Sequence, residues 1–283
     1  MKITPNNLEA FRTWLLERGR SDDTADLYLT NLRTCAAHPK GLTHRLIAGE
    51  LAPNTVRTNL ASLRAWAKFT EDAAFAKRLG DIRLPPARRV KTKLPLGAAD
   101  WKRVVRHLHT CTMRPPAMRH VLLIMAIRGF RSGDVLRMKR TEVVRALATG
   151  KLHYEGKGRK RIEFSAEPIR EQLQALADIR GWERVRDLLG TGTSRRGLSR
   201  KVWRAAVRTA KGCGIPEMNP HRYRHTVATQ FLAELKGDPN AIVKLQKWMA
   251  WESMGTAARY VDQISVDELD RIGAGLVKNL LRP

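Results

Sequence analysis

The sequence is poor in cysteine, in acidic side chains and in long apolar runs. Its three cysteines, Cys35, Cys111 and Cys213, are scattered over 283 residues, and their spacing fits neither a disulfide framework nor a zinc site. We therefore expect a protein of a reducing cytosol. The longest apolar run, residues 121–127, is far too short to span a bilayer, and the opening MKITPNNLEAF is no signal peptide. We expect a cytoplasmic protein without a membrane partner.

The shortage of acidic residues leaves a large positive charge. The chain has 53 Lys and Arg against 27 Asp and Glu, which gives a formal net charge of +26. The basic residues recur along the whole chain rather than in a tail. Such an excess usually accompanies a polyanionic partner, and nucleic acid is the first candidate. The alternative is a solvated basic surface.

Apolar residues recur at helical spacing through most of the chain, so the predicted fold is mainly α. A hydrophobic fraction of 43% is enough to fill a proper core. Residues 151–164, with Gly-Lys-Gly-Arg-Lys at their centre, predict a β-hairpin, the one clear strand region. Helices are expected at residues 5–18, after Ser21, from Pro53, and at 98–109, 117–127, 167–178, 182–189, 197–211 and from Asn219. A turn at residues 129–134 is expected to lead into a further short helix that ends at Met138.

A basic segment rich in proline divides the chain. Residues 81–96 read DIRLPPARRVKTKLPL, a composition typical of an extended linker. We therefore predict a helical N-terminal domain at residues 1–82, a linker at 83–97 and a second domain at 98–283.

The helix expected from Pro53 carries two stripes. One is apolar and repeats every three or four residues. The other lies about 100° away and consists of Arg57, Arg64 and Lys68. One face would pack on the domain while the other docks on a DNA backbone or groove. A solvated charged face is an equal alternative for this helix alone.

The helix start at Asn219 carries the strongest chemical signal. Asn219 is a good N-cap, and Pro220 suits the first helical position. His221 and Arg224 then share one face of the first turn. Free backbone N–H groups and the helix dipole make this turn an anion site, and phosphate is the expected anion.

Other segments add groups that handle phosphate. Arg131 follows a turn, and Lys157 lies at the hairpin tip. Two guanidinium groups can bind a phosphodiester and stabilise the charge of its transition state. A lysine can protonate a leaving oxygen, a histidine can move a proton, and a tyrosine such as Tyr260 can be the nucleophile. Taken singly, each of these residues also fits an ordinary surface or core role.

In order and spacing, these segments resemble the boxes of the tyrosine recombinases of the phage integrase family. RGFRSGDVL resembles the first-arginine box, YEGKGRKRIEF the hairpin-lysine segment, PHRYRHTVAT the His-x-x-Arg box and TAARYVD the tyrosine segment. Nine residues before the tyrosine, where the family has Leu-Gly-His, this chain has Met249-Ala250-Trp251. An indole can donate a hydrogen bond but cannot shuttle a proton. Cre-like recombinases share this tryptophan.

The resemblance implies the fold and the site. The fold is a helical core-binding domain followed by a mostly helical catalytic domain with a small antiparallel sheet. The implied catalytic set is Arg131, Lys157, His221, Arg224 and Trp251, with Tyr260 as nucleophile. For DNA binding we add Arg159 and Lys160 of the hairpin to Arg57, Arg64 and Lys68.

The implied activity is site-specific DNA recombination through a 3′-phosphotyrosine intermediate and a Holliday junction, without cofactor, metal ion or ATP. The implied partner is duplex DNA with an inverted-repeat site, in the nucleoid and on a mobile genetic element. A homotetramer would bind it by exchanging a C-terminal helix, residues 266–281. We expect the simple Cre-like or Xer-like type, without an arm-binding domain. A type IB topoisomerase, a telomere resolvase and a catalytically idle DNA-binding protein remain alternatives.

Overall fold

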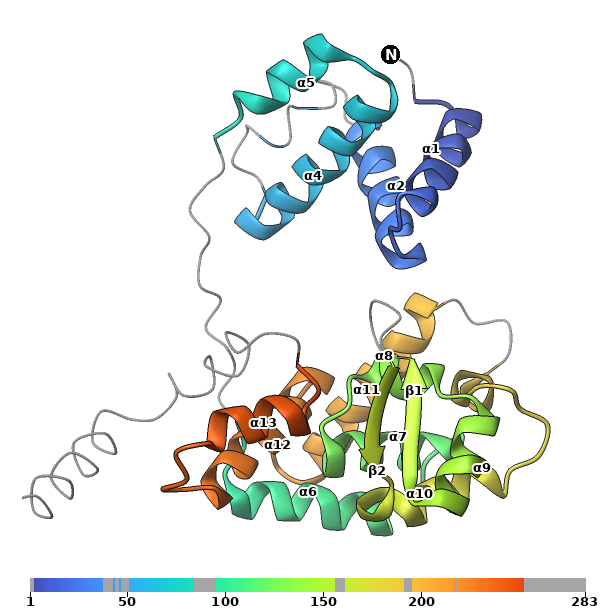
Figure 1. Ribbon diagram of the computed structural model, residues 1–283, viewed down its shortest axis with the longest axis vertical. Coiled ribbons are helices and arrows are strands. Elements are labelled where there is room, and N and C mark those ends of the chain that lie inside the picture. Colours follow the sequence, from blue (N-terminus) through green and yellow to red (C-terminus); the bar gives the residue numbers. More distant parts are fainter. Residues whose placement is uncertain are drawn as a thin grey trace, which may run out of the picture. The chain divides into compact units, whose positions relative to one another are not determined.

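The chain divides into two compact units, residues 1–92 and 93–283 (Figure 1). The division falls inside the predicted linker, residues 83–97, of which 84–94 lie outside the described residues. This computed structural model describes residues 3–37, 43, 46, 51–83, 95–155, 161–190, 195–216 and 218–251.

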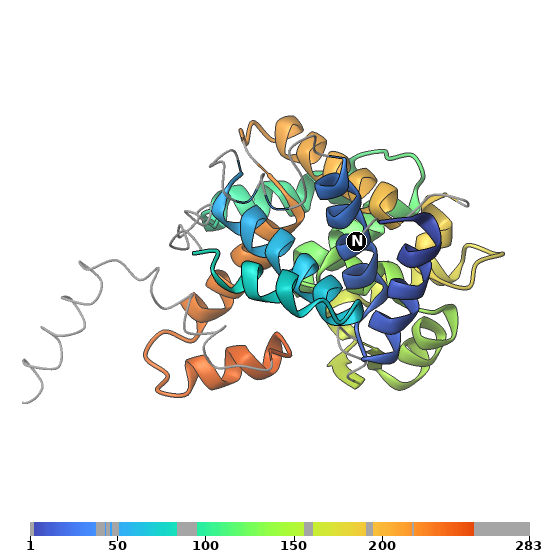
Figure 2. The ribbon, with the colours of Figure 1, turned by 90° about the horizontal axis from the view of Figure 1, so that it is seen from above.

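Unit 1, residues 1–92, is built from helices that lie side by side in two views (Figures 1 and 2). Its first two helices begin where predicted, because the Thr4 and Ser21 side chains accept hydrogen bonds from free N–H groups of the first turn. The core is aromatic, with Phe11 packed edge-on against Trp66. The described helices are α1 (Pro5–Glu17), α2 (Asp22–Ala36), α4 (Pro53–Phe69) and α5 (Ala73–Gly80).

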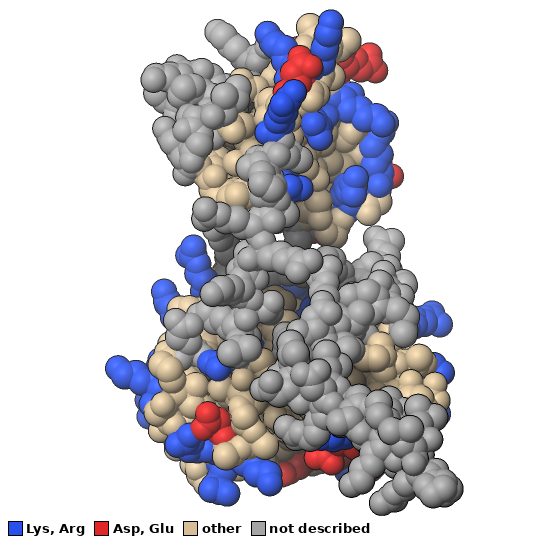
Figure 3. All heavy atoms as spheres, turned by 90° about the vertical axis from the view of Figure 1, so that its left-hand side faces the viewer, with Lys and Arg blue, Asp and Glu red and all other residues tan. Residues whose placement is uncertain are grey.

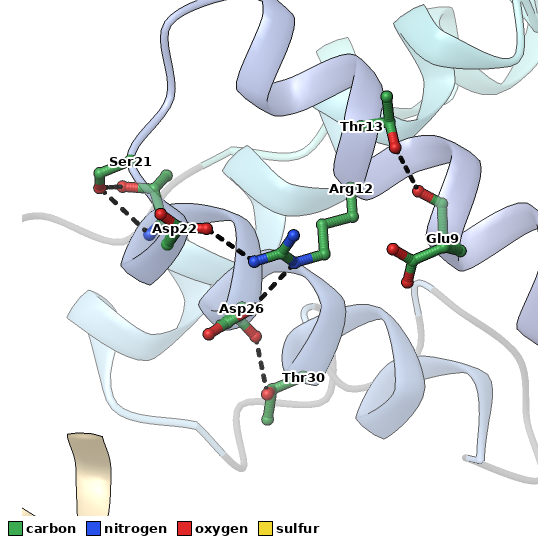
Figure 4. Close-up of polar contacts among 8 residues, drawn as sticks. Glu9, Arg12, Thr13, Ser21, Asp22, Asp26 and Thr30 are labelled. Carbon is green, nitrogen blue, oxygen red and sulfur yellow. Dashed lines mark hydrogen bonds and ion pairs between the residues drawn. The ribbon is translucent and has the colours of Figure 1, made fainter. Parts of the chain in front are cut away.

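An arginine connects the first two helices of this unit. Arg12 of α1 lies 2.6 Å from Asp22 and 3.5 Å from Asp26, both on α2 (Figure 4). Both carboxylates are largely exposed, so these pairs contribute little stability compared with the apolar core.

Unit 2, residues 93–283, is helical with one small sheet. Strands β1 (Lys151–Glu155) and β2 (Arg161–Ser165) are antiparallel, with Lys151 opposite Ser165, so the predicted hairpin is confirmed. The mainly α fold with a small antiparallel sheet is confirmed as well. The helices are α6 (Ala98–Thr110), α7 (Ala117–Arg128), α8 (Ser132–Arg137), α9 (Arg140–Thr149), α10 (Arg170–Ala177), α11 (Arg195–Gly212), α12 (Pro220–Glu234) and α13 (Ala241–Trp248), with short 3₁₀ helices η1 (Glu167–Ile169) and η2 (Val185–Leu189).

Helix α7 forms the centre of unit 2. Residues 121–127 of this helix are apolar on all sides, and Val121, Leu122 and Met125 have no exposed surface. Helices α6, α10, α11 and α12 all pack against it, so the residues that follow its C-terminal end have a fixed position. Neither α7 nor any other helix in the described ranges has the length and apolar character that crossing a membrane requires.

The helix expected at residues 182–189 is wrong in its extent and type. Only Val185–Leu189 is helical, as a 3₁₀ turn. Lys139 and Arg184 form an antiparallel bridge, and the Val185 N–H donates to the Met138 carbonyl at 3.0 Å. This long-range pairing keeps the start of the segment extended. Helices α5, α9 and α13 were not predicted.

Candidate phosphate-binding site

The start of α12 has the predicted geometry. The Asn219 side chain accepts a hydrogen bond from the Arg222 N–H at 3.0 Å, and Pro220 is the first helical residue. This cap fixes the turn that carries His221 and Arg224. The first N–H groups of a helix have no partner within the helix, so they favour an anion at this end.

Arg224 is buried, with 7% of its surface exposed. Its Nη1 donates to the Gly129 carbonyl at 2.7 Å, and its Nη2 donates to the Met249 carbonyl at 3.1 Å. Gly129 ends α7, and Met249 follows α13. Arg224 therefore joins three elements in addition to any contact that it makes with phosphate.

Gly129 permits this close approach. Its φ of +69° is in the left-handed region, which favours glycine. A Cβ atom there would lie 3.1 Å from Met249 Cε and 3.2 Å from Val227 Cγ1. A side chain at this position would strain the left-handed backbone and would require the Met249 and Val227 side chains to shift.

Arg131 is positioned by a buried carboxylate. It is the N-cap residue of α8, and its Nη1 lies 4.0 Å from Asp134 Oδ2. Asp134 also accepts a hydrogen bond from Arg137 at 2.6 Å, which fixes the carboxylate. The Arg131 side chain remains 43% exposed, so it can reach a ligand.

His221 lies close to both arginines. Partial burial of its ring, followed by the positive charges of Arg131 and Arg224, lowers the pKa of His221 below 6.5. The imidazole is therefore neutral at pH 7. The neighbouring His225 was not singled out from the sequence, although it directly follows Arg224. Its pKa is lowered by burial, by His221 and by Arg224, so it shares the same charged surroundings.

Trp251 packs against Arg224. The centroid of its ring lies 5.3 Å from the Arg224 guanidinium carbon, a cation–π distance, and only 7% of the residue is exposed. A backbone hydrogen bond closes the turn before it: the Gln246 carbonyl accepts from the backbone N–H of Trp251 at 2.9 Å. Ala250 has a φ of +49°, an unfavourable conformation for alanine. Trp251 therefore packs against Arg224, in addition to the hydrogen bond to phosphate that we expect from its indole N–H.

Several predicted site residues lie outside the described residues. They are Lys157, Arg159 and Lys160 of the hairpin tip, the nucleophile Tyr260 and the expected exchange helix, residues 266–281.

The predicted basic stripe of α4 is partly engaged within unit 1. Arg64 donates from Nη2 to the Leu79 carbonyl at 3.1 Å, and it thereby supports the last turn of α5. Arg57 is half-buried, and Lys68 is exposed.

A second basic stripe lies on α11 and was not predicted from the sequence. This helix contains seven Lys and Arg residues and no acidic residue. Arg200, Arg204, Arg208 and Lys211 are exposed and recur at spacings of 4, 4 and 3, which was the available signal. Trp203 beside them is 50% exposed. Lys and Arg also prevail over Asp and Glu on the described surface in Figure 3.

The described ranges contain no group of three or more His, Cys, Asp and Glu side chains that could hold a metal ion. The charged groups that converge at the start of α12 are basic, and they suit an anionic ligand.

A sequence model of the phage integrase family matches residues 97–265, more than half of the chain. The chain belongs to the phage integrase family. It is a tyrosine recombinase, and its activity is site-specific DNA recombination. The matched span contains the start of α12, Arg131 and Tyr260.

Solved structures share the fold of this recombinase. A dimer of lambda integrase (residues 75–356) bound to a COC′ core site gives a TM-score of 0.61 at 16% identity, covering 91% of this chain and 95% of that one. The Tn1549 transposon integrase with a circular intermediate DNA gives 0.59 at 13%, covering 95% and 98%. XerH bound to a palindromic difH substrate gives 0.57 at 15%, covering 89% and 79%. No curated protein sequence gives a significant match.

Proposed function

We propose that this recombinase cleaves DNA by attack of the Tyr260 hydroxyl on a scissile phosphate. A bond forms between the tyrosine oxygen and phosphorus, and the bond from phosphorus to the 5′ oxygen breaks. The products are a 3′-phosphotyrosine ester and a free 5′-hydroxyl. A 5′-hydroxyl from a partner strand then reverses the step. The ester preserves the energy of the phosphodiester, so rejoining needs no ATP.

The convergence of Arg131, His221 and Arg224 at the start of α12 is the observation that carries this proposal. Two guanidinium groups suit the non-bridging oxygens of a phosphodiester, where charge increases in the transition state. Lys157 protonates the leaving 5′ oxygen, and Trp251 contributes a hydrogen bond from its indole N–H. These last two roles rest on the family resemblance.

His221 accepts the proton that Tyr260 loses. Its lowered pKa supports this role, because only the neutral imidazole has a nitrogen that can take up a proton. The positive charges beside it disfavour the protonated state until the doubly negative transition state forms. The proton therefore moves to His221 when the phosphorane is most negative.

The pH dependence of cleavage tests this assignment. The acidic limb of the rate at low DNA concentration should lie below the pH at which an ordinary histidine titrates, because the pKa of His221 is lowered by burial and by the two arginines. His221→Gln should remove this acidic limb and lower the rate by about 10²-fold. His225→Gln is the matched control, and it should keep the limb. An acidic limb that persists without His221 would assign the proton to another group.

We further propose that strand exchange passes through a Holliday junction in a tetramer bound to inverted-repeat DNA. The C-terminal helix, residues 266–281, passes to a neighbouring subunit in this assembly. A mobile genetic element is the expected source of the DNA site. Inverted repeats in the DNA that flanks the gene are the first candidates for that site.

The function is tested with a nicked suicide substrate and a plasmid that carries two candidate sites. Wild-type protein should form an adduct with DNA that resists denaturing detergent. It should also delete the DNA between direct repeats and invert the DNA between inverted repeats. Relaxation without exchange would indicate a type IB topoisomerase, and hairpin ends would indicate a telomere resolvase. A failure to form any adduct would indicate an idle DNA-binding protein.

The basic stripe of α11 is proposed to contact the DNA backbone. Binding should weaken with salt at a log–log slope near −0.9 for each phosphate neutralised. Arg204→Ala and Arg208→Ala should each make this slope shallower by about one. Arg145→Ala, which removes an exposed arginine from α9, is the control and should leave the slope unchanged. Equal slopes for all the variants would remove α11 from the DNA interface.

A further inference from the structure

Arg128, the last residue of α7, is stacked between two aromatic rings. Its guanidinium carbon lies 4.4 Å from the ring centroid of Phe164 on β2 and 4.0 Å from that of Trp248 on α13. Trp248 also stacks on Phe231 of α12, with the centroids 4.4 Å apart and the rings 18° from parallel. The four side chains form one continuous stack across β2, α7, α13 and α12.

Each of these four elements leads to a part of the candidate site. Helix α7 is followed within three residues by Arg131, and α13 within three residues by Trp251. Helix α12 carries His221 and Arg224. Strand β2 begins four residues after Lys157 in the sequence. The stack therefore links the elements that position Arg131, His221, Arg224 and Trp251.

Apolar packing alone does not explain an arginine at this position. Arg128 is 6% exposed, and its Nε and Nη1 atoms have no hydrogen-bond partner among the described residues. Burial also lowers the pKa of Arg128 to about 10. A buried charge with unpaired N–H groups costs free energy, and stacking on two rings offsets only part of that cost. An unbranched apolar side chain would be at least as stable here.

We propose that Arg128 is a positioning residue for strand cleavage, which holds the turn after α13 and the hairpin in register with the arginines of the site. Trp248 precedes Met249, and the Met249 carbonyl accepts a hydrogen bond from Arg224 at 3.1 Å. A shift of Trp248 displaces that carbonyl and, with it, the buried Arg224 guanidinium. Residues that reduce stability, such as a buried arginine with unpaired N–H groups, are expected near functional sites.

Arg128→Met and Arg128→Lys test the proposal in the full-length protein. Methionine keeps an unbranched side chain between the rings but removes the planar cation. We expect Arg128→Met to unfold at or above the wild-type melting temperature and to bind DNA with unchanged affinity. Its single-turnover cleavage of a nicked suicide substrate should be slower by about tenfold or more, because small displacements of reacting groups have large effects on rate. Arg128→Lys should recover part of the rate.

A stacked arginine in unit 1 supplies the matched control. Arg18 lies 4.1 Å above the Trp14 ring but is exposed, so Arg18→Met should leave stability and cleavage unchanged. The double variant Arg128→Met/Trp248→Leu should cleave about as slowly as Arg128→Met alone, because both changes break one stack.

Two results would overturn the inference: cleavage by Arg128→Met at the wild-type rate, or a melting temperature that falls along with cleavage, which would make the role structural. The inference rests on the proposed function. If the wild-type protein forms no covalent adduct with DNA, the proposed function and the inference are both wrong. If wild type and Arg128→Met form the adduct at equal rates, only the positioning role of Arg128 is wrong.

Discussion

Replacing Tyr260 with phenylalanine is expected to abolish the covalent protein–DNA adduct. The chain has four tyrosines, and two of the other three are buried in unit 2. Tyr28 belongs to unit 1, and Tyr223 has no exposed surface. Tyr154 is 5% exposed, and burial followed by the negative charge of Asp134 raises its pKa far above 10. A phenol that resists ionisation inside the core cannot approach a phosphate. Phenylalanine at position 260 removes only the attacking oxygen.

The matched control is Tyr154→Phe. Tyr154 interacts electrostatically with Arg131 and Arg224, so it is a rival tyrosine in the charged surroundings of the site. Its ring packs against Phe130 and Phe164, and phenylalanine preserves those contacts. We expect Tyr154→Phe to form the adduct and Tyr260→Phe to form none, as measured on a denaturing gel. The opposite pattern would identify Tyr154 as the nucleophile.

Arg131→Ala and Arg224→Ala should both reduce cleavage by about 10²–10³-fold, the usual effect of removing one donor that stabilises transition-state charge. Their effects on stability should differ. Arg131 is 43% exposed, and its Nη1 lies 4.0 Å from Asp134 Oδ2, a long distance for an ion pair. The loss of Arg131 should therefore leave the free energy of unfolding nearly unchanged. Arg224 is buried, and its loss leaves the Gly129 and Met249 carbonyls without this donor. We expect Arg224→Ala to lower the free energy of unfolding by at least about 2 kcal/mol.

Single-turnover cleavage and urea unfolding separate the two effects. Arg103→Ala provides a control, because Arg103 is exposed and pairs only locally with Asp100. It should change neither quantity. Wild-type cleavage by Arg131→Ala would exclude Arg131 from the catalytic set. Unchanged stability of Arg224→Ala would mean that its two bonds to backbone carbonyls contribute nothing to the fold.

The parts of the site that depend on local chemistry could be predicted from the sequence. Asn219 as N-cap and Pro220 as first helical residue predicted where α12 begins. The Gly-Lys-Gly-Arg-Lys sequence between two β-forming segments predicted that β1 and β2 pair as antiparallel strands. The extended segment before Val185 depends on a bridge between Lys139 and Arg184, residues far apart in the chain. Apolar periodicity carries no information about such a pairing, and the predicted helix was therefore too long.

Contacts between distant residues also account for what the sequence interpretation missed in the site. The stack of Arg128 joins residues 128, 164 and 248, which no spacing rule brings together. The attachment of Arg224 to two backbone carbonyls is equally invisible, because a motif gives the residue type but not its partners. The α11 stripe differs, since its 4, 4, 3 spacing was present in the sequence.

The two carbonyl bonds of Arg224 have a practical consequence for trapping an uncleaved complex. Inactive variants are commonly used to capture an enzyme with intact DNA for crystallography or cryo-electron microscopy. A variant at position 224 would lose both the reaction and a connection among α7, α12 and the turn after α13, so the captured geometry would be distorted. Tyr260→Phe and Arg131→Ala leave that connection in place, and they are the better choices for imaging the substrate before cleavage.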